Sequence, residues 1–219
     1  MSSLLSGPVA ATIDELYRKA DDQRRTRSRG GGRPGFDTSS AQERADAMAE
    51  VYMPIAPMAG QLLYSLIRAA RPEAVVEFGM SFGISTLHLA AAVRDNGIGR
   101  VYTTELSETK IASATATFAD AGVADVITVL PGDARTTLTT VPGPVGVVLL
   151  DGWKEMYLEV LTLIAPTLSP GALVIADNTE SDGAQPYLEH VRAPGGGYVS
   201  VNFPGKQGDT MEISCWAGR

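Results

Sequence analysis

From Pro72 onward the sequence alternates short apolar runs with longer segments of helical spacing, and this rhythm limits the folds open to the chain. The runs have the length and the Val, Ile and Leu content of buried strands. Strands separated by helices form right-handed crossovers, which make the strands parallel and place helices on both faces of the sheet. The sequence therefore predicts parallel strands at Ala74–Phe78, Val101–Thr104, Val126–Leu130, Val145–Leu150 and Ala172–Ala176.

The end of the chain has a different pattern, because two strand-like runs follow each other without a helix between them. They are Tyr198–Phe203 and Met211–Trp216, joined by the turn Pro-Gly-Lys-Gln-Gly-Asp. Such a pair predicts an antiparallel hairpin, here at one edge of the sheet. We therefore expect an α/β fold with a seven-stranded, mostly parallel sheet and helices at Ile84–Arg94, Glu108–Ala121, Lys154–Leu168 and Ala184–Val191.

The first 52 residues read as a helical segment with a loop rich in Arg and Gly. The loop, Asp21–Asp37, carries five arginines around Gly30–Gly32 and lacks apolar anchors. It fits a mobile, solvated linker, or a lid or arm that grips an anionic substrate or a partner subunit. Helices are expected at Thr12–Ala20, from the capping box at Ser40 to about Tyr52, and at Pro57–Ala70.

Composition excludes several classes of protein. The 219 residues suit one domain, and the net charge of −7 argues against wholesale nucleic-acid binding. The longest charge-free runs are broken by prolines and a glycine, and the first ten residues lack a signal-peptide pattern, so we expect a cytoplasmic protein with no membrane partner. Cys215 alone cannot form an internal disulfide and reads as a small buried hydrophobe; His88 reads as a packing residue and His190 as a surface residue.

Polar residues follow the predicted strands at the edge where ligands of open α/β sheets bind. The first strand leads into a glycine-rich turn, Gly79 to Gly83, followed by Ser85. This turn lacks both the dinucleotide-binding spacing and the lysine of a phosphate-binding loop. Glu77 beside it would repel phosphates and attract an ammonium or sulfonium group. Further acids at strand ends are Glu105, Asp133, Asp151 and Asp177.

These acids suggest distinct roles. Glu105, at the end of the second strand, can accept both hydroxyls of a ribose. Asp133 can receive an adenine amino group or cap the next helix. Asp151, Asp177 and Asn178 offer three hard oxygen ligands of the kind that Mg²⁺ or Ca²⁺ prefers. Lys154 follows Asp151 by three residues, and a metal beside a lysine suggests deprotonation of a hydroxyl.

These motifs resemble those of the class I S-adenosylmethionine-dependent methyltransferases, specifically the metal-dependent catechol O-methyltransferase-like family. The resemblance covers about Met53 to Trp216. Its most specific parts are the segment Leu-Asp-Gly-Trp-Lys-Glu-Met-Tyr, which begins at Leu150, and the segment Ala-Asp-Asn, which ends at Asn178. The resemblance implies a Rossmann-like fold, with residues 1–52 as a lid or dimer element and residues 53–219 as the methyltransferase domain.

The family's roles, carried over to this sequence, divide the site into two ends. At the acceptor end, Lys154 would be the general base, Trp153 would line the pocket of a small aromatic vicinal diol, and Mg²⁺ or another divalent cation would bind Asp151, Asp177, Asn178 and the substrate oxygens. The residues that would hold the S-adenosylmethionine are Met53, Ile55, Glu77, Gly79, Gly83, Ser85, Glu105, Asp133, Ala134 and Asp151.

The sequence departs from the family at two positions. Gly152 replaces a histidine that packs on adenine in the animal enzyme, and Phe203 falls where that enzyme has a glutamate for the second hydroxyl. Bacterial relatives are often homodimers, which suggests the same here. Two alternatives stay open: a metal-independent methyltransferase acting on nitrogen or a lone hydroxyl, and a protein that binds S-adenosylmethionine without turnover.

Overall fold

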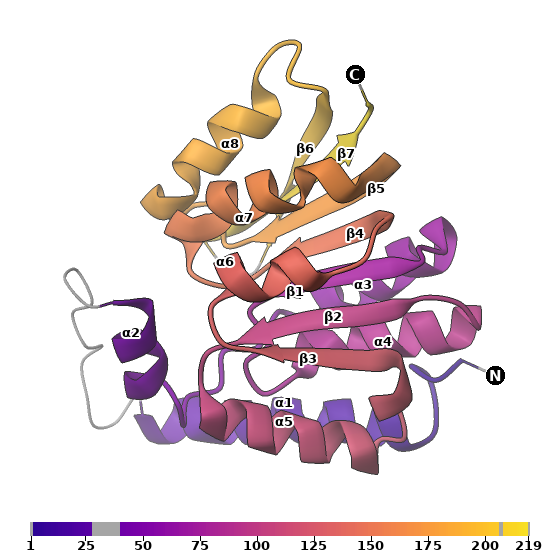
Figure 1. Cartoon of the computed structure of the whole chain (residues 1–219). Helices are drawn as coiled ribbons and strands as arrows, with labels where there is room; N and C mark the ends of the chain where they lie inside the picture. The colour runs from indigo at the N-terminus through magenta and orange to yellow at the C-terminus, as the bar shows by residue number, and fades with distance from the viewer. Residues whose placement is uncertain (1, 28–39, 206–207, 219) are drawn as a thin grey trace.

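A seven-stranded sheet forms the centre of the molecule, in the strand order β3-β2-β1-β4-β5-β7-β6 (Figure 1). The computed structural model describes residues 2–27, 40–205 and 208–218. The first five strands are parallel, whereas β7 runs antiparallel to both β5 and β6. This arrangement confirms the predicted sheet, and its strands are β1 Ala74–Phe78, β2 Arg100–Glu105, β3 Ile127–Pro131, β4 Val145–Leu150, β5 Leu168–Asp177, β6 Tyr198–Pro204 and β7 Thr210–Trp216.

Helices cover both faces of the sheet (Figure 1). Side chains of α1, α3, α4 and α5 join one buried apolar cluster, and those of α6, α7 and α8 join a second cluster on the other face. The helices are α1 Pro8–Arg27, α2 Ala41–Ala47, α3 Pro57–Ala70, α4 Ile84–Asn96, α5 Glu108–Asp120, α6 Ala134–Thr137, α7 Tyr157–Ile164 and α8 Gln185–Arg192.

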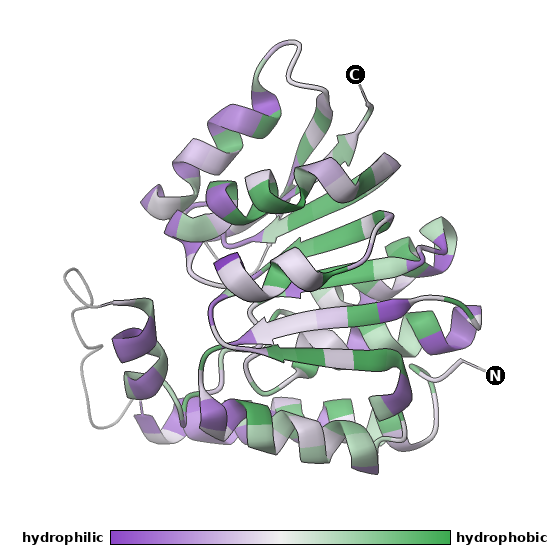
Figure 2. Ribbon diagram, viewed as in Figure 1, coloured by the Kyte–Doolittle hydropathy of each residue, from purple (hydrophilic) through white to green (hydrophobic). Residues whose placement is uncertain are grey.

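The central strands are apolar along their whole length because both of their faces are covered. In β1, Val75 points into the first cluster and Val76 into the second, and neither is exposed. In Figure 2, β4 and β5 likewise carry the green of hydrophobic residues along most of their length. Since successive side chains of a strand point to opposite faces, an uninterrupted apolar run is what a doubly covered strand requires.

Three helix predictions need correction. Residues 21–27 are not part of a loop, because α1 continues through Arg27 with its basic residues in the last turn, where they complement the helix dipole. The helix that begins after Ser40 ends at Ala47, well short of Tyr52. The helix expected over Lys154–Leu168 has 3₁₀ turns before and after α7, and Leu168 already belongs to β5. Residues 28–37 of the predicted loop lie outside the described residues.

The long helix α1 is part of the main core. Val9, Ile13 and Leu16 are buried in the same cluster as α4, so this part of residues 1–52 packs as an integral element. Its suggested role as a lid or dimer element stays a prediction. Among the described residues, no helix combines the length and the apolar content needed to cross a membrane.

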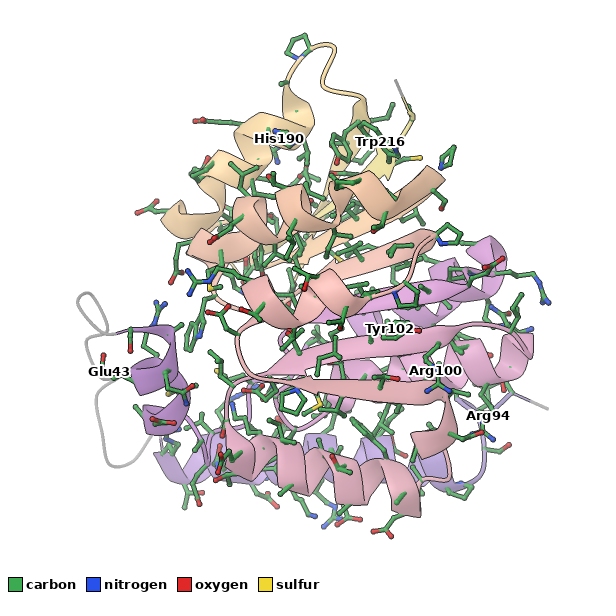
Figure 3. The ribbon with its side chains drawn as sticks, viewed as in Figure 1. Glu43, Arg94, Arg100, Tyr102, His190 and Trp216 are labelled. Carbon is green, nitrogen blue, oxygen red and sulfur yellow. The ribbon has the colours of Figure 1, made fainter. Side chains whose placement is uncertain are left out.

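The minor predictions have mixed outcomes. His190 is exposed on α8, where its ring lies 5.8 Å from that of Tyr198, and Figure 3 shows it beside the hairpin strands. Cys215 is only partly buried, which corrects the expectation of a buried residue, because it lies in the hairpin at the sheet's edge. His88 is a packing residue as predicted and is 3% exposed.

His88 packs directly against α3 and α1. A Cβ atom at Gly60 would lie 2.4 Å from its ring, and the ring of Tyr17 lies 6.3 Å away. Among the described residues, neither imidazole nitrogen has a hydrogen-bond partner. Burial therefore disfavours the charged form and lowers the pKa of His88 to about 4.

We expect His88→Leu to change how stability depends on pH. The unfolded wild-type chain takes up a proton at His88 below about pH 6.5, whereas the folded chain does not until about pH 4, so the wild type loses stability over this range as pH falls. The variant lacks this loss. Its free energy of unfolding, relative to that of the wild type, should therefore rise by about 2 kcal/mol as the pH falls from 7.5 to 5.

Urea unfolding at the two pH values measures this difference, and other titrating groups cancel between the two proteins. His190→Gln, at an exposed histidine, is the matched control. A stability difference for His88→Leu that is the same at both pH values would contradict the prediction.

Candidate active site

A cavity of about 890 Å³ lies at the carboxyl ends of the five parallel strands, β1 to β5. The last turn of α1 and the helix α2 also line it. Figure 3 shows Glu43 on α2 near this end of the sheet, with Arg94 and Arg100 near the opposite end. The volume is at the upper end of the range for small-molecule sites, so a cofactor and a second ligand can be accommodated together.

The glycine-rich turn after β1 forms the floor of the cavity. Gly79 has a φ of +100°, and a Cβ atom there would lie 2.7 Å from the backbone nitrogen of Gly152. Glycine is therefore required for the turns after β1 and β4 to touch. Gly83 ends the turn as the N-cap of α4, and Ser85 in its first turn lines the cavity.

Glu105 connects the end of β2 to the glycine-rich turn. One carboxylate oxygen accepts a hydrogen bond of 2.8 Å from the Ser81 backbone nitrogen. The other accepts bonds of 2.9 Å from the backbone nitrogens of Leu106 and Ser107. These bonds fix the carboxylate at the cavity wall, where it has lone pairs left to accept further hydrogen bonds.

Glu77 lies beneath the cavity and does not line it. It is fully buried in β1, where one carboxylate oxygen accepts bonds of 2.5 Å from the hydroxyls of both Thr86 and Thr103. Burial is the main cause that raises its pKa to about 7, against the opposing effect of the hydroxyls of Ser85, Thr103 and Thr86. Gly83 does not line the cavity either, since its Cα faces the ring of Phe118, whereas the other residues expected to contact the donor do line it.

Asp133 follows β3 and caps α6. Its side chain accepts a hydrogen bond of 2.9 Å from the Arg135 backbone nitrogen and pairs with the Arg135 guanidinium. This pairing is the main cause that lowers the pKa of Asp133. Asp133 and Ala134 both line the cavity, so the capping role and contact with a ligand are compatible.

The segment between α2 and α3 covers the cavity. Met53 is 43% exposed and Ile55 is buried, and both line the cavity as expected. The neighbouring Tyr52 ring stacks on Phe82 of the glycine-rich turn at 4.2 Å. Its backbone nitrogen also donates to the Gln23 side chain of α1 at 2.9 Å. The segment is thus attached to both α1 and the turn.

Lys154 lies between two oxygens at the other end of the cavity. Its Nζ is 3.3 Å from Asp151 Oδ1 and donates to the Tyr157 hydroxyl at 2.8 Å. That hydroxyl donates its own proton to the backbone carbonyl of Asp177 at 2.9 Å. Burial raises the pKa of Tyr157 well above its usual value, so Tyr157 stays neutral and can only accept from Lys154.

Asn178 adds an amide to the two carboxylates. It has a left-handed backbone with a φ of +59°, and its Nδ2 donates to Asp209 Oδ2. The described residues contain no cluster of three or more His, Cys, Asp or Glu side chains that could hold a metal. A cation here would therefore need the amide oxygen of Asn178 beside Asp151 and Asp177, and this set of hard oxygens suits Mg²⁺.

Trp153 forms the wall above Lys154, and α2 packs on it. The Arg44 guanidinium lies 4.4 Å from the centre of the Trp153 ring and also pairs with Glu155. A guanidinium over an indole ring is an attractive contact. It attaches α2, which lies outside the family resemblance, to the wall of the cavity.

Several residues in or beside the cavity had no predicted role. Lys110 is 2% exposed, its pKa is lowered by burial, and its Nζ lies 5.6 Å from the centre of the Phe82 ring. Sequence spacing gave no signal for Lys110 or Arg44, since both meet their partners only in the fold. The acid at the end of the hairpin turn, Asp209, could have been noted from its place before a strand.

The departure at Gly152 has a structural cause. A Cβ atom there would lie 2.5 Å from the ring of Phe78, the last residue of β1. We expect Gly152→Ala to lower stability by about 1–3 kcal/mol through overpacking and to weaken donor binding. Urea unfolding and calorimetric titration with S-adenosylhomocysteine measure the two effects.

Adding Phe78→Leu should restore most of both losses, because it removes the atoms that clash. The single variant Phe78→Leu provides the baseline for this double-mutant cycle. Strictly additive effects of the two substitutions would show that Phe78 is not the reason for glycine at position 152.

Comparisons with known proteins agree with this arrangement. A family model described as a methyltransferase domain matches residues 76–179, from β1 to just beyond Asn178. A protein of Mycobacterium tuberculosis named "Probable O-methyltransferase Rv1703c" is 33% identical to this chain. The match covers 61% of this chain and 60% of that protein's length. Catechol O-methyltransferase of Sus scrofa is 29% identical over 62% of this chain and 76% of its own.

Solved structures support the same assignment. The O-methyltransferase TomG from Streptomyces achromogenes, determined in complex with S-adenosylmethionine, is 25% identical, with a TM-score of 0.68 over 83% of this chain and 92% of its own. The fold, the strand-end residues and these similarities together lead to one assignment. The chain belongs to the S-adenosylmethionine-dependent O-methyltransferases, in the family that resembles catechol O-methyltransferase.

Proposed function

We propose that this protein transfers the methyl group of S-adenosylmethionine to a hydroxyl of a small aromatic vicinal diol, with a divalent cation in the site and Lys154 as the general base. The observation that carries the proposal is the position of Lys154. Its amine lies in the same cavity as Glu105 and the glycine-rich turn, beside Asp151 and close to Asp177. A base, a set of oxygen ligands and a donor site thus share one space.

The donor would lie along the ends of β1 and β2. Glu105 would accept the ribose hydroxyls, and the backbone around Gly79 with Ser85 would contact the methionine part. Met53 and Ile55 would close over it from the segment tied to α1. The main role of these contacts would be to hold the methyl group in line with the acceptor oxygen. Alignment of this kind can lower the activation barrier by roughly 7–11 kcal/mol.

A divalent cation would be held by the carboxylates of Asp151 and Asp177 and the amide oxygen of Asn178. The donor set supports this assignment, since two carboxylates and one amide at adjacent strand ends match the preference of Mg²⁺ for oxygen. When bound, such a cation would supply Lewis-acid stabilisation for the hydroxyl that loses its proton.

Lys154 would accept the acceptor's proton. As a neutral amine it has two N–H groups and one lone pair. The two N–H groups can be directed to Tyr157 and Asp151, which leaves the lone pair for the acceptor hydroxyl. The acceptor oxygen then forms a bond to the methyl carbon, the carbon–sulfur bond breaks, and the sulfonium becomes a neutral thioether.

The cavity wall at Trp153 and the named relatives both favour an aromatic acceptor. Trp153 offers an aromatic surface close to Lys154, and relatives such as the Sus scrofa protein are named catechol O-methyltransferase. A vicinal diol would present two oxygens to one cation, which fixes which hydroxyl faces the methyl group. A homodimer and a cytoplasmic location stay predictions.

We expect methyl transfer to catechol-type acceptors to stop when metal is removed. Excess EDTA should abolish transfer from labelled S-adenosylmethionine, and excess Mg²⁺ should restore it. Binding of S-adenosylhomocysteine, followed by calorimetry, should persist in EDTA because the donor contacts named above are protein groups. Full turnover in EDTA would instead favour the metal-independent alternative, and donor binding without product under all conditions would favour the non-catalytic one.

Lys154→Ala should lower turnover by about 10²–10⁴-fold, the range for loss of a general base, while donor affinity stays within about twofold of wild type. Lys19→Ala on the surface of α1 is the matched control. Steady-state kinetics and donor titration separate the two effects. Equal losses of turnover and donor binding would speak against a base role for Lys154.

A further inference from the structure

We propose that Asp209 is a positioning residue, which orients the Asn178 side chain so that the amide oxygen faces the cavity. The proposal rests on the proposed function, because it gives Asn178 the part of a metal ligand. Sequence reasoning assigned no role to Asp209, which lies directly before β7 in the hairpin turn and lines the cavity.

The position of Asp209 is fixed by its own turn. Its carbonyl oxygen accepts a hydrogen bond of 2.9 Å from the backbone nitrogen of Gly205, across the hairpin. Its Oδ1 accepts a bond of 2.8 Å from the backbone nitrogen of Thr210. One carboxylate oxygen is therefore occupied within the turn, and the other, Oδ2, faces Asn178.

The chain around Asn178 is attached to the same hairpin. Asp177 pairs with Met211 in the β5–β7 ladder. Beyond Asn178, the backbone nitrogen of Thr179 donates to the carbonyl of Thr210 at 2.9 Å, and the hydroxyls of these two threonines lie 2.6 Å apart. Asn178 is thus held between two contacts with the strand that Asp209 precedes, and its side chain meets the carboxylate in a defined geometry.

The chemistry of the pair selects one orientation of the amide. A carboxylate only accepts hydrogen bonds, whereas an amide has a donor side and an acceptor side. Nδ2 of Asn178 donates to Asp209, so the amide oxygen is directed away from it. Turning the amide over would place two acceptors against each other, at the cost of a lost hydrogen bond and electrostatic repulsion.

The proposal predicts that Asp209→Asn weakens metal binding. The oxygen of an asparagine at 209 would keep the hydrogen bond from the Thr210 backbone nitrogen, so its NH2 group would face Asn178 and favour the opposite orientation of the Asn178 amide. Loss of a group that orients a ligand typically lowers metal affinity 10–100-fold. We expect a loss in this range for Mn²⁺, measured with the metal alone by electron paramagnetic resonance of the free ion, without donor or acceptor present.

A matched control separates orientation from charge. Glu180→Gln removes one negative charge close by, from an exposed side chain that accepts a hydrogen bond from the Thr210 hydroxyl and makes no described contact with Asn178. We expect this variant to keep the Mn²⁺ affinity within about threefold of wild type. Unchanged titration with S-adenosylhomocysteine in both variants would establish that the donor site is still folded.

A double variant tests the hydrogen bond itself. In Asn178→Asp with Asp209→Asn, the amide and carboxylate exchange places, so the donor and the acceptor are reversed and the net charge is kept. We expect it to recover most of the Mn²⁺ affinity lost in Asp209→Asn. A double variant as weak as the single one would overturn the proposal.

The outcomes distinguish this proposal from the function on which it rests. Wild-type protein that binds no Mn²⁺ would overturn both the metal site and the role of Asp209. Wild-type protein that binds Mn²⁺ while Asp209→Asn binds it as well as Glu180→Gln does would overturn the role of Asp209 alone.

Discussion

The burial of a parallel sheet between two layers of helices is the constraint on which the rest of this structure depends. Strands buried on both faces must be apolar, so the polar groups of the site collect where the chain leaves the sheet. Parallel strands all end at the same edge of the sheet, and the residues that follow β1 to β5 therefore meet in one cavity although they are far apart in sequence. Glu77 is an exception, because its carboxyl group is buried inside β1. It accepts hydrogen bonds from the hydroxyls of Thr86 and Thr103, and burial raises its pKa.

Much of the architecture could be predicted because it is encoded locally. The apolar runs gave all seven strands and the terminal hairpin, and the glycine-rich turn and the polar residues at strand ends gave most of the cavity. What could not be predicted depends on contacts between distant segments. No sequence pattern predicts three such features. They are the length of α1, the contact of Arg44 with Trp153 and the hydrogen bond between Asn178 and Asp209. The burial of Glu77 could not be predicted for a related reason, since its position next to the turn did not reveal which way its side chain points, and its contact with the donor stays a prediction.

Two buried titratable groups act in opposite directions on stability. Burial raises the pKa of Glu77 to about 7 and lowers that of His88 to about 4. Between about pH 4.5 and 6.5 the folded state holds a proton at Glu77 that the unfolded state releases, while the unfolded state holds one at His88 that the folded state lacks. The two contributions to the pH dependence of unfolding largely cancel in this range, so a flat stability profile of the whole protein would conceal two strongly perturbed groups.

The attachment of α2 bears on how such a protein can evolve. The family match begins at residue 76, yet Ala41 and Ala45 of α2 line the cavity, and Arg44 of the same helix pairs with Glu155 and lies over the ring of Trp153. The proposed donor end is lined mainly by strand ends and the glycine-rich turn, apart from Met53 and Ile55. Substitutions in α2 can therefore reshape the space next to Trp153 while the strand ends stay as they are. Under the proposed function, α2 would influence the choice of acceptor while the strand ends would keep the chemistry, so substitutions could alter one without altering the other.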